Sequence, residues 1–160
     1  GAVPVSPAAA VRAALNVVNL STPLGVLVGV VGRARFHRGP DALLLAEGYA
    51  LTVPKAGAFT VGNVIIVPGG NLAELEERRP GTTAHEAVHA WQWCYCLGLP
   101  FLVGYGLASA WSWLRTGHPA AANFFESSAD LARGGYPELP RNNAGLHRIR
   151  SALRRTPSPR

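Results

Sequence analysis

The run His85-Glu86-Ala87-Val88-His89 has the residue types and the spacing of a metal site. On a helix, residues four apart lie on one face, so His85 and His89 can direct ring nitrogens at one ion while Glu86 lies beside it. Zinc in hydrolytic sites usually takes three protein ligands and leaves a fourth position to water. The run therefore predicts a zinc centre in which Glu86 acts as the general base on that water.

The third metal ligand has to come from another part of the chain, and Glu126 is the best-placed acid. It lies between Phe125 and Ala129, where a carboxylate needs a cation, whereas the acids at 74–77 lie beside two arginines in a run typical of a solvated surface. Asp130 follows Glu126 by one helical turn, and a metal-bound histidine normally donates its other N–H to a carboxylate or carbonyl. We therefore predict Glu126 as the third ligand and Asp130 as a supporting partner. A solvated helix face carrying both acids would have the same sequence pattern.

The motif resembles that of the gluzincin metallopeptidases, in which the two histidines of HExxH and a downstream glutamate hold zinc. The longer string from His85 to Gln92, preceded by the run at 58–67, is similar to a bacterial family of HExxHxxQ domains that are regarded as peptidases. This likeness covers about residues 35 to 135. The metzincin pattern does not fit, because it needs a histidine where this chain has Tyr95, and no thermolysin-type substrate domain is recognisable. The resemblance implies a zinc-dependent peptidase with a minimal zincin-like core.

A peptidase of this kind also needs a hydrogen-bond donor for the oxyanion and a place for the substrate backbone. The available donors are Tyr136, His118, Tyr105 and His147. Tyr136 is the first choice because it lies about one turn past the helix expected to carry Glu126. In similar peptidases an edge strand beside the motif helix receives the substrate as an added strand, and the run at 60–67 is expected to take that place. Thr60 and Asn63 are its candidate substrate-binding residues, although both residue types more often serve local turns and strand pairing.

Three other interpretations fit the same residues. A zinc enzyme with a narrow closed pocket would act on a small molecule rather than on a peptide. A fourth protein ligand, leaving no position for water, would make the metal structural and the protein a non-catalytic binding module. Without a metal, the two histidines would only cap or cross-link the core.

The order of the expected elements indicates an α+β fold, with a small twisted sheet of antiparallel type followed by a helical half that carries the HExxH helix. Strands are predicted at 26–36, 50–53 and 60–67, and a short helix or turn at 42–47. The sheet is expected to end at Pro68-Gly69-Gly70. Helices are predicted from Pro7 to Val18 with Ser6 as the cap, up to Cys96 with Thr82 or Thr83 as the cap, over 101–114, and after Pro119 as far as Arg133.

Composition and charge indicate one compact domain, residues 1–140, and a basic tail, residues 141–160. A chain of 160 residues with 48% hydrophobic and 15% charged residues can bury a substantial core. Residues 1–140 hold nine basic and nine acidic residues, so the net charge of +6 comes from the tail. The tail is predicted to be disordered and is a candidate for contact with a polyanion such as nucleic acid or lipid headgroups.

Residues 90–114 hold no charged side chain and are long enough in principle to cross a bilayer. Glycines and Pro100 interrupt the segment, and crossing would take the metal helix into lipid. We therefore expect an apolar hairpin that packs on the core or touches a membrane or a protein partner. Cys94 and Cys96 would point to opposite sides of a helix, which predicts no disulfide between them and slightly favours a cytoplasmic location.

Overall fold

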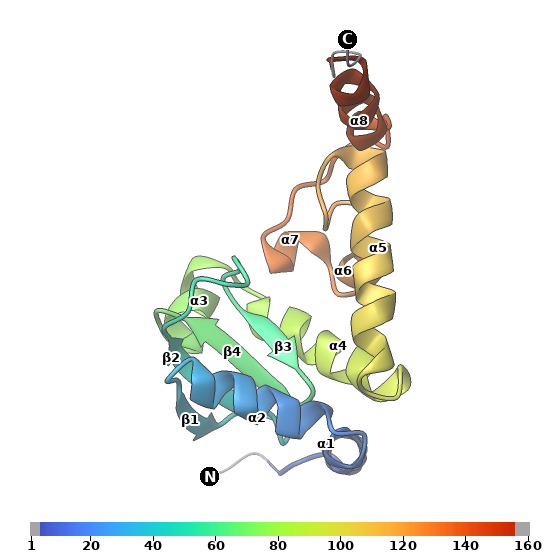
Figure 1. Ribbon diagram of the computed structural model, residues 1–160. Helices are drawn as coiled ribbons and strands as arrows, with labels where there is room; N and C mark the ends of the chain where they lie inside the picture. The colour runs from blue at the N-terminus through green and yellow to red at the C-terminus, as the bar shows by residue number, and fades with distance from the viewer. Residues whose placement is uncertain (1–3, 156–160) are drawn as a thin grey trace.

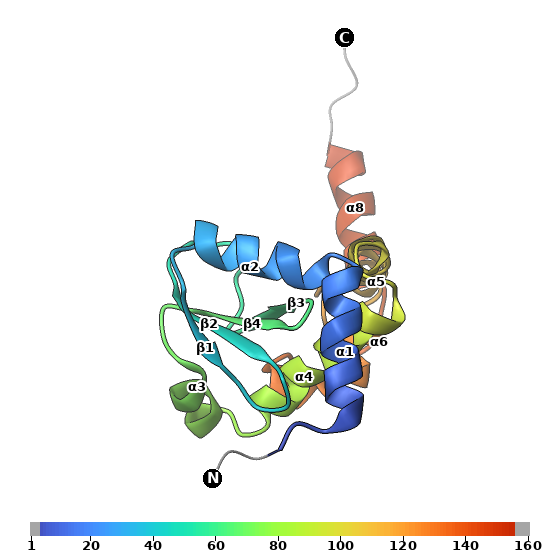
Figure 2. The same cartoon turned by 90° about the horizontal axis from the view of Figure 1, so that it is seen from below.

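The computed structural model describes residues 4–155, which form an α+β fold with the sheet in the N-terminal half, as predicted (Figures 1 and 2). Helix α2 (Ser21–Val31) covers one face of the sheet, and α3 (Leu72–Arg78) and α4 (Thr82–Tyr95) cover the other. Helix α5 (Pro100–Thr116) stands beside these layers, and α8 (Ala144–Arg155) continues from its far end.

The sheet is mixed rather than antiparallel. Its strands are β1 (Arg35–Arg38), β2 (Leu44–Tyr49), β3 (Phe59–Val61) and β4 (Val64–Pro68), in the order β1-β2-β4-β3. The two outer pairs are antiparallel, whereas β2 and β4 run parallel. Ile65 and Val67 of β4 pack on the side of α3 and α4, and Val64 and Ile66 pack on the side of α2. Because both faces are covered, β4 is a continuous apolar run, typical of a central strand.

The run at 60–67, predicted as one strand, is a hairpin of β3 and β4 that ends, as expected, at Pro68. A two-residue turn, Gly62-Asn63, joins the strands, and Val61 pairs with Val64 across it. Gly62 has a φ of 61°, a conformation that glycine adopts at little steric cost. The hairpin leaves β3 at the edge of the sheet, next to α4.

The predicted strand at 26–36 is wrong over most of its length, because α2 extends to Val31. Small residues recur every fourth position on its buried side, at Ser21, Gly25 and Gly29. A Cβ atom on Gly25 would collide with the β3–β4 hairpin, so this helix approaches the sheet more closely than one with larger residues could. Close packing on the sheet therefore outweighs the β-branched composition that favours a strand.

Two shorter predictions in this half are also wrong. The run at 42–47, predicted as a short helix or turn, lies largely in β2, where it gains β1 and β4 as pairing partners. The run at 50–53, predicted as a strand, lies in the connection between β2 and β3. Leu51 and Val53 are exposed there, so apolar composition alone did not indicate strand pairing.

Helix α1 (Pro7–Val18) begins as predicted, with the Ser6 side chain accepting a hydrogen bond from the Ala9 N–H. It packs against α4. The buried Asn16 side chain donates to the backbone oxygen of Ala90, and the buried Arg12 guanidinium lies over the Trp91 ring. These contacts fix the helix that carries the HExxH motif.

The N-terminus of α4 is capped from α3 rather than by Thr82 or Thr83. The Glu76 carboxylate accepts hydrogen bonds from the Gly81 N–H at 2.5 Å and from the Thr83 N–H at 2.8 Å. The Thr83 N–H is the main reason that the pKa of Glu76 lies below its ordinary value. An acid from another helix thus satisfies the free N–H groups of the motif helix.

The predicted helix from Pro119 to Arg133 is two shorter ones, α6 (Phe124–Ser128) and α7 (Leu131–Gly134). The chain turns between them at Asp130, whose φ is 76°. The helix predicted at 101–114 is present as α5 and ends at Gly117, which has the left-handed conformation common at helix C-termini.

The tail predicted to be disordered holds α8 over Ala144–Arg155, so that prediction is wrong for these residues. Gly145 lies against the backbone of Trp113, and this close approach lets α8 pack on the end of α5. Residues 156–160 of the predicted tail lie outside the described residues, and the boundary at 140 stays a prediction.

Within residues 4–155 no single helix is long and apolar enough to cross a membrane. The pairs α1–α2 and α4–α5 reach that length and hydropathy only together, and they are bent by 75° and 120°. Cys94 and Cys96 are both free, as predicted.

Candidate metal centre

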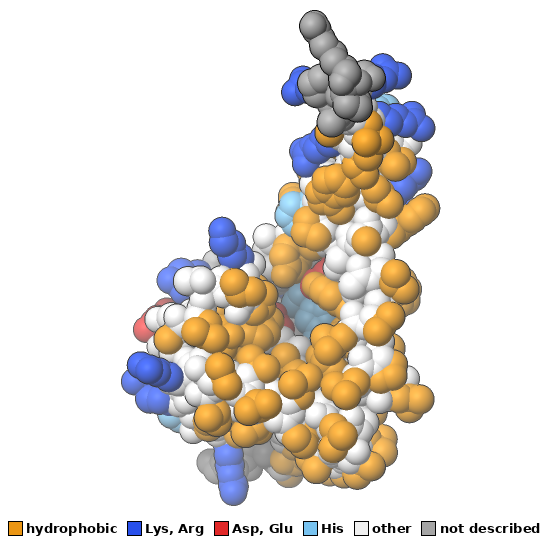
Figure 3. Space-filling view, in the orientation of Figure 1, with side chains coloured by type: hydrophobic (Ala, Val, Ile, Leu, Met, Phe, Trp, Pro, Cys, Tyr) orange, Lys and Arg blue, Asp and Glu red, His pale blue; other side chains and the backbone are white. Residues whose placement is uncertain are grey.

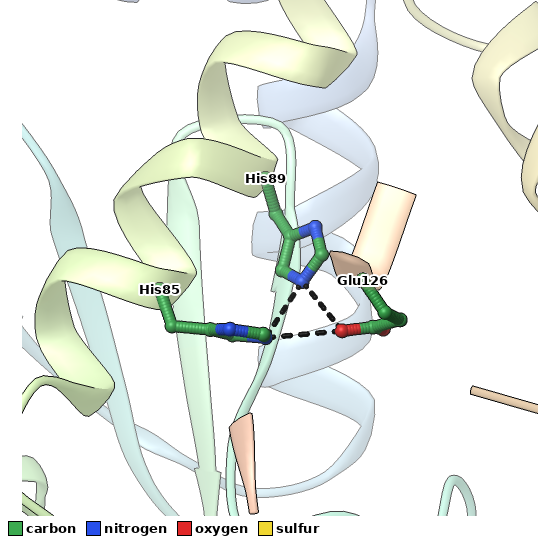
Figure 4. Close-up of side chains that lie close together, drawn as sticks. All are labelled: His85, His89 and Glu126. Carbon is green, nitrogen blue, oxygen red and sulfur yellow. Dashed lines mark hydrogen bonds and ion pairs between the residues drawn. The ribbon is translucent and has the colours of Figure 1, made fainter. Parts of the chain in front are cut away.

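Three side chains that can bind a metal meet in the interior of the protein, at the predicted positions (Figure 4). His85 and His89 project from successive turns of α4, and Glu126 reaches them from α6. Nε2 of His85 lies 3.0 Å from Nε2 of His89 and 3.0 Å from Oε2 of Glu126, and the third distance, from His89 Nε2 to Glu126 Oε2, is 3.3 Å. A tetrahedral zinc with bonds of 2.0–2.1 Å separates its ligand atoms by about 3.3 Å. The three atoms are therefore spaced as the corners of one face of a zinc tetrahedron.

Hydrogen bonds on the far side of each ring determine which nitrogen faces the centre. Nδ1 of His85 lies 2.8 Å from the backbone oxygens of Ala129 and Asp130, which can only accept. Nδ1 of His89 lies 2.7 Å from Oε1 of Gln92. The neutral rings therefore carry their proton on Nδ1 and direct an unprotonated Nε2 at the centre, as metal-binding histidines do.

Three hydrogen-bond acceptors thus converge where water has little access. Among the described residues, Oε2 of Glu126 is one of two buried side-chain nitrogen or oxygen atoms without a hydrogen-bond partner. The partial negative charges of these three atoms repel one another unless a cation lies between them. A proton can serve: burial is the largest single cause and lowers the pKa of His89, but the hydrogen bond to Glu126 and the charges of Glu86 and Glu126 together outweigh it and raise the pKa above its ordinary value. A divalent metal can serve equally, and the donor set of two imidazoles and a carboxylate fits zinc.

Glu86 lies beside the three candidate ligands and lines the same cavity as His89 and Glu126. Its carboxylate is buried, and Oε2 accepts a hydrogen bond of 2.7 Å from the Thr60 hydroxyl on β3. Burial is the main cause that raises the pKa of Glu86 above its ordinary value, although the two histidines and Thr60 oppose the change. A buried carboxylate with a raised pKa takes up a proton more readily than an exposed one, which is the property that a general base needs.

The predicted supporting role of the Asp130 carboxylate is wrong. This side chain is about half exposed, caps α7 by accepting from the Ala132 N–H, and pairs with Arg133. The backbone oxygen of Asp130, rather than its carboxylate, lies next to His85. Asp130 breaks the helix that was expected to be continuous, so its side chain turns away from the ligand that precedes it by four residues.

Gln92 is the supporting residue for which the sequence analysis gave no role. Its Oε1 accepts from His89, and its Nε2 donates to the backbone oxygen of Phe125 at 2.9 Å, which fixes the orientation of the amide. The signal was present in the sequence, because Gln92 follows His89 by three residues on the same helix and so lies on the same face. Gln92 also joins α4 to α6, the helix that carries Glu126.

Replacing Gln92 with leucine is expected to weaken zinc binding by about 10- to 100-fold, the scale for loss of a partner that orients a metal ligand. Leucine has nearly the same size but cannot accept the hydrogen bond from Nδ1–H of His89. Competition with a zinc chelator of known affinity measures the change. Gln92→Glu keeps the acceptor and should retain more affinity than Gln92→Leu; equal affinity in all three proteins would contradict the role of Gln92.

The centre opens into a cavity of about 670 Å³ between the β3 edge, α2 and α5. Figure 3 shows histidine and acidic side chains at the bottom of a hollow whose surroundings are mostly hydrophobic. Apolar residues from all three elements line it, including Val28, Phe59, Val61, Phe101 and Leu102. The cavity therefore brings an apolar binding surface up to the polar centre.

Three of the four candidate oxyanion donors, Tyr136, His118 and Tyr105, line this cavity. His147 lies exposed on α8 and does not line it. The Tyr105 hydroxyl donates to Oε1 of Glu126 at 2.5 Å, so Tyr105 orients this candidate ligand. Burial and the nearby carboxylates of Glu126 and Glu86 raise the pKa of Tyr136, which keeps its hydroxyl protonated and able to donate. The assignment of Tyr136 as the oxyanion donor stays a prediction.

The two predicted substrate-binding residues have other partners. The side chain of Asn63 accepts from Arg12 Nε at 2.9 Å and donates to the backbone oxygen of Ala42, so it joins the hairpin turn to α1. The Thr60 hydroxyl donates to Glu86, and its backbone oxygen accepts from the Trp93 indole at 2.9 Å. The structure thus corrects the assignment of Asn63, which is a structural residue away from the cavity. Thr60 positions Glu86 and lines the cavity, so its part in substrate binding stays a prediction.

Comparisons with protein-family models, with curated proteins and with solved structures gave no match to this chain. The likeness to gluzincins and to HExxHxxQ domains therefore stays a prediction, and a functional assignment has to rest on the geometry of the centre.

Proposed function

We propose that this protein is a zinc-dependent hydrolase that cleaves peptide bonds. The observation that carries the proposal is the convergence of two imidazole Nε2 atoms and one carboxylate oxygen without a hydrogen-bond partner, with the buried acid Glu86 beside them. A structural zinc site has four protein ligands, whereas only three candidate ligands gather here within residues 4–155. This count favours a catalytic centre over a metal-stabilised binding module.

Each residue of the centre would have a different role in the reaction. His85, His89 and Glu126 would hold the zinc, which supplies a Lewis acid that activates water and polarises a carbonyl group. Glu86, held by Thr60, would accept the proton of the attacking water and later pass it to the leaving nitrogen. Tyr136 would donate a hydrogen bond to the oxyanion that develops on the substrate.

The shape of the cavity favours a peptide over a small molecule. It is an open hollow rather than a narrow closed pocket, and the edge strand β3 forms part of its wall (Figure 3). An extended peptide fits beside such an edge. One of the edge groups, the backbone oxygen of Thr60, already accepts a hydrogen bond from the Trp93 indole. The apolar lining further supports a substrate with a large apolar side chain next to the bond that is cleaved.

The test is hydrolysis by the zinc-loaded full chain. We expect about one zinc per chain by metal analysis, cleavage of a mixed library of unstructured peptides detected by mass spectrometry, loss of cleavage with a chelator, and recovery when zinc is added back. Zinc binding with no cleaved peptide, but with turnover of small esters or amides, would support the small-molecule enzyme instead. A folded chain that does not bind zinc would contradict the metal centre itself.

A further inference from the structure

The outer face of α5 holds side chains that a helix facing water seldom presents. Its six exposed positions between Leu102 and Trp111 carry no polar or charged side chain. These positions are Leu102, Val103, Gly106, Leu107, Ala110 and Trp111. Val103 and Leu107 are 66% and 68% exposed, and with Trp111 they form one row along the helix. The solvent face of a helix in a globular protein is normally polar, so this face requires a different explanation.

The exposed positions of α2 have the same character. They are Pro23, Leu27, Val30 and Val31, and no charged residue lies anywhere in this helix. In Figure 3 hydrophobic side chains gather over α2 and along α5, on both sides of the hollow. Val28 of α2 and Leu102 of α5 line the cavity, which therefore lies between these two apolar helices. We call the exposed positions of α2 and α5 the apolar rim.

Positive charge lies at one end of the apolar rim. Helices α5 and α8 contain five arginines and no acidic residue. These arginines are Arg115, Arg148, Arg150, Arg154 and Arg155, and all except Arg115 are exposed on α8. The Arg115 guanidinium lies over the ring of Trp111, at 5.5 Å from its centroid. The combination of an apolar face with flanking arginines and an interfacial tryptophan is typical of segments that bind the surface of an anionic membrane.

We propose that the apolar rim docks onto a lipid bilayer with anionic headgroups, which the arginines of α8 contact. Nucleic acid is a poorer occupant, because its phosphates require cations across the interface and the outer face of α5 offers none between Leu102 and Trp111. In this proposal α2 and α5 lie along the membrane surface, because the opposite side of each helix is buried in the protein, at Gly25 and Gly29 of α2 and at Phe101 and Ser112 of α5. Docking turns the mouth of the cavity toward the lipid. The proposal does not depend on the zinc centre or on its activity.

Flotation of the full chain with lipid vesicles tests the docking. We expect binding to vesicles of phosphatidylcholine with phosphatidylglycerol, and weaker binding to phosphatidylcholine alone or at high salt. Val103→Asp with Leu107→Asp should lower the partition coefficient by more than about tenfold, because two charges enter the apolar contact. Leu27→Asp on α2 should lower it independently.

The matched control is Ala73→Asp with Arg78→Gln, which changes the net charge by the same amount at exposed positions of α3, and it should bind as the unmodified chain does. Arg148→Gln with Arg150→Gln should lose only the part of the binding that depends on anionic lipid. No binding of the unmodified chain to either vesicle, or equal losses in the rim and control variants, would overturn the proposal. A dimer in solution that Val103→Asp with Leu107→Asp makes monomeric, without vesicle binding, would assign the rim to a second copy of the chain.

Discussion

The Glu86→Gln protein is expected to bind zinc as the unmodified protein does and to hydrolyse peptides about 10²- to 10⁴-fold more slowly. Glutamine has the same size as glutamate and can still accept the hydrogen bond from Thr60, but it cannot take up a proton. Because Glu86 is not one of the three residues whose ligand atoms converge at the centre, its replacement should leave the candidate metal ligands in place. Metal analysis and the initial rate of peptide cleavage measure the two effects on one preparation.

Glu77→Gln is the matched control for this experiment, because it makes the same chemical change at an exposed position of α3. We expect it to leave both zinc content and rate unchanged. If Glu86→Gln lost the metal as well as the activity, Glu86 would be a ligand rather than the base. If it kept its full rate, the hydrolytic mechanism would have to use another base.

Glu126→Ala is expected to weaken zinc binding by more than the roughly 100-fold that loss of a supporting partner causes, because it removes an atom that binds the metal directly. The substitution also removes the buried carboxylate that accepts the Tyr105 hydroxyl, so Tyr105→Phe should be measured beside it. Tyr105→Phe keeps the three ligands and should weaken zinc binding less. Titration with zinc in the presence of a competing chelator gives the affinities.

Asp130→Asn is the control for Glu126, since the two acids lie four residues apart and only Glu126 reaches the centre. Asparagine can still cap α7, and the contact to His85 comes from the backbone, so zinc affinity should stay the same. A loss with Asp130→Asn as large as that with Glu126→Ala would mean that the carboxylate of Asp130 turns inward in solution.

The sequence determined the part of the centre that depends on local geometry. Two histidines four residues apart on one helix must lie on one face, because the helix repeats every 3.6 residues. The place of Glu126 beside the two histidines was predictable for a chemical reason: Glu126 lies among apolar residues, where a carboxylate requires a cation. The α+β class followed from the order of the elements along the chain.

Only the tertiary structure decided the partners of these residues. The apolar run that became α2 fits a strand as well as a helix in sequence, and the close packing of Gly25 and Gly29 on the sheet determined the outcome. The parallel pairing of β2 with β4 likewise depends on segments far apart in the chain. The turn at Asp130 directed its carboxylate to solvent and placed its backbone oxygen against His85. Helical period and composition indicate the secondary structure that one segment prefers. The contacts that orient the side chains of the centre form between distant segments, so they depend on which groups the fold brings together.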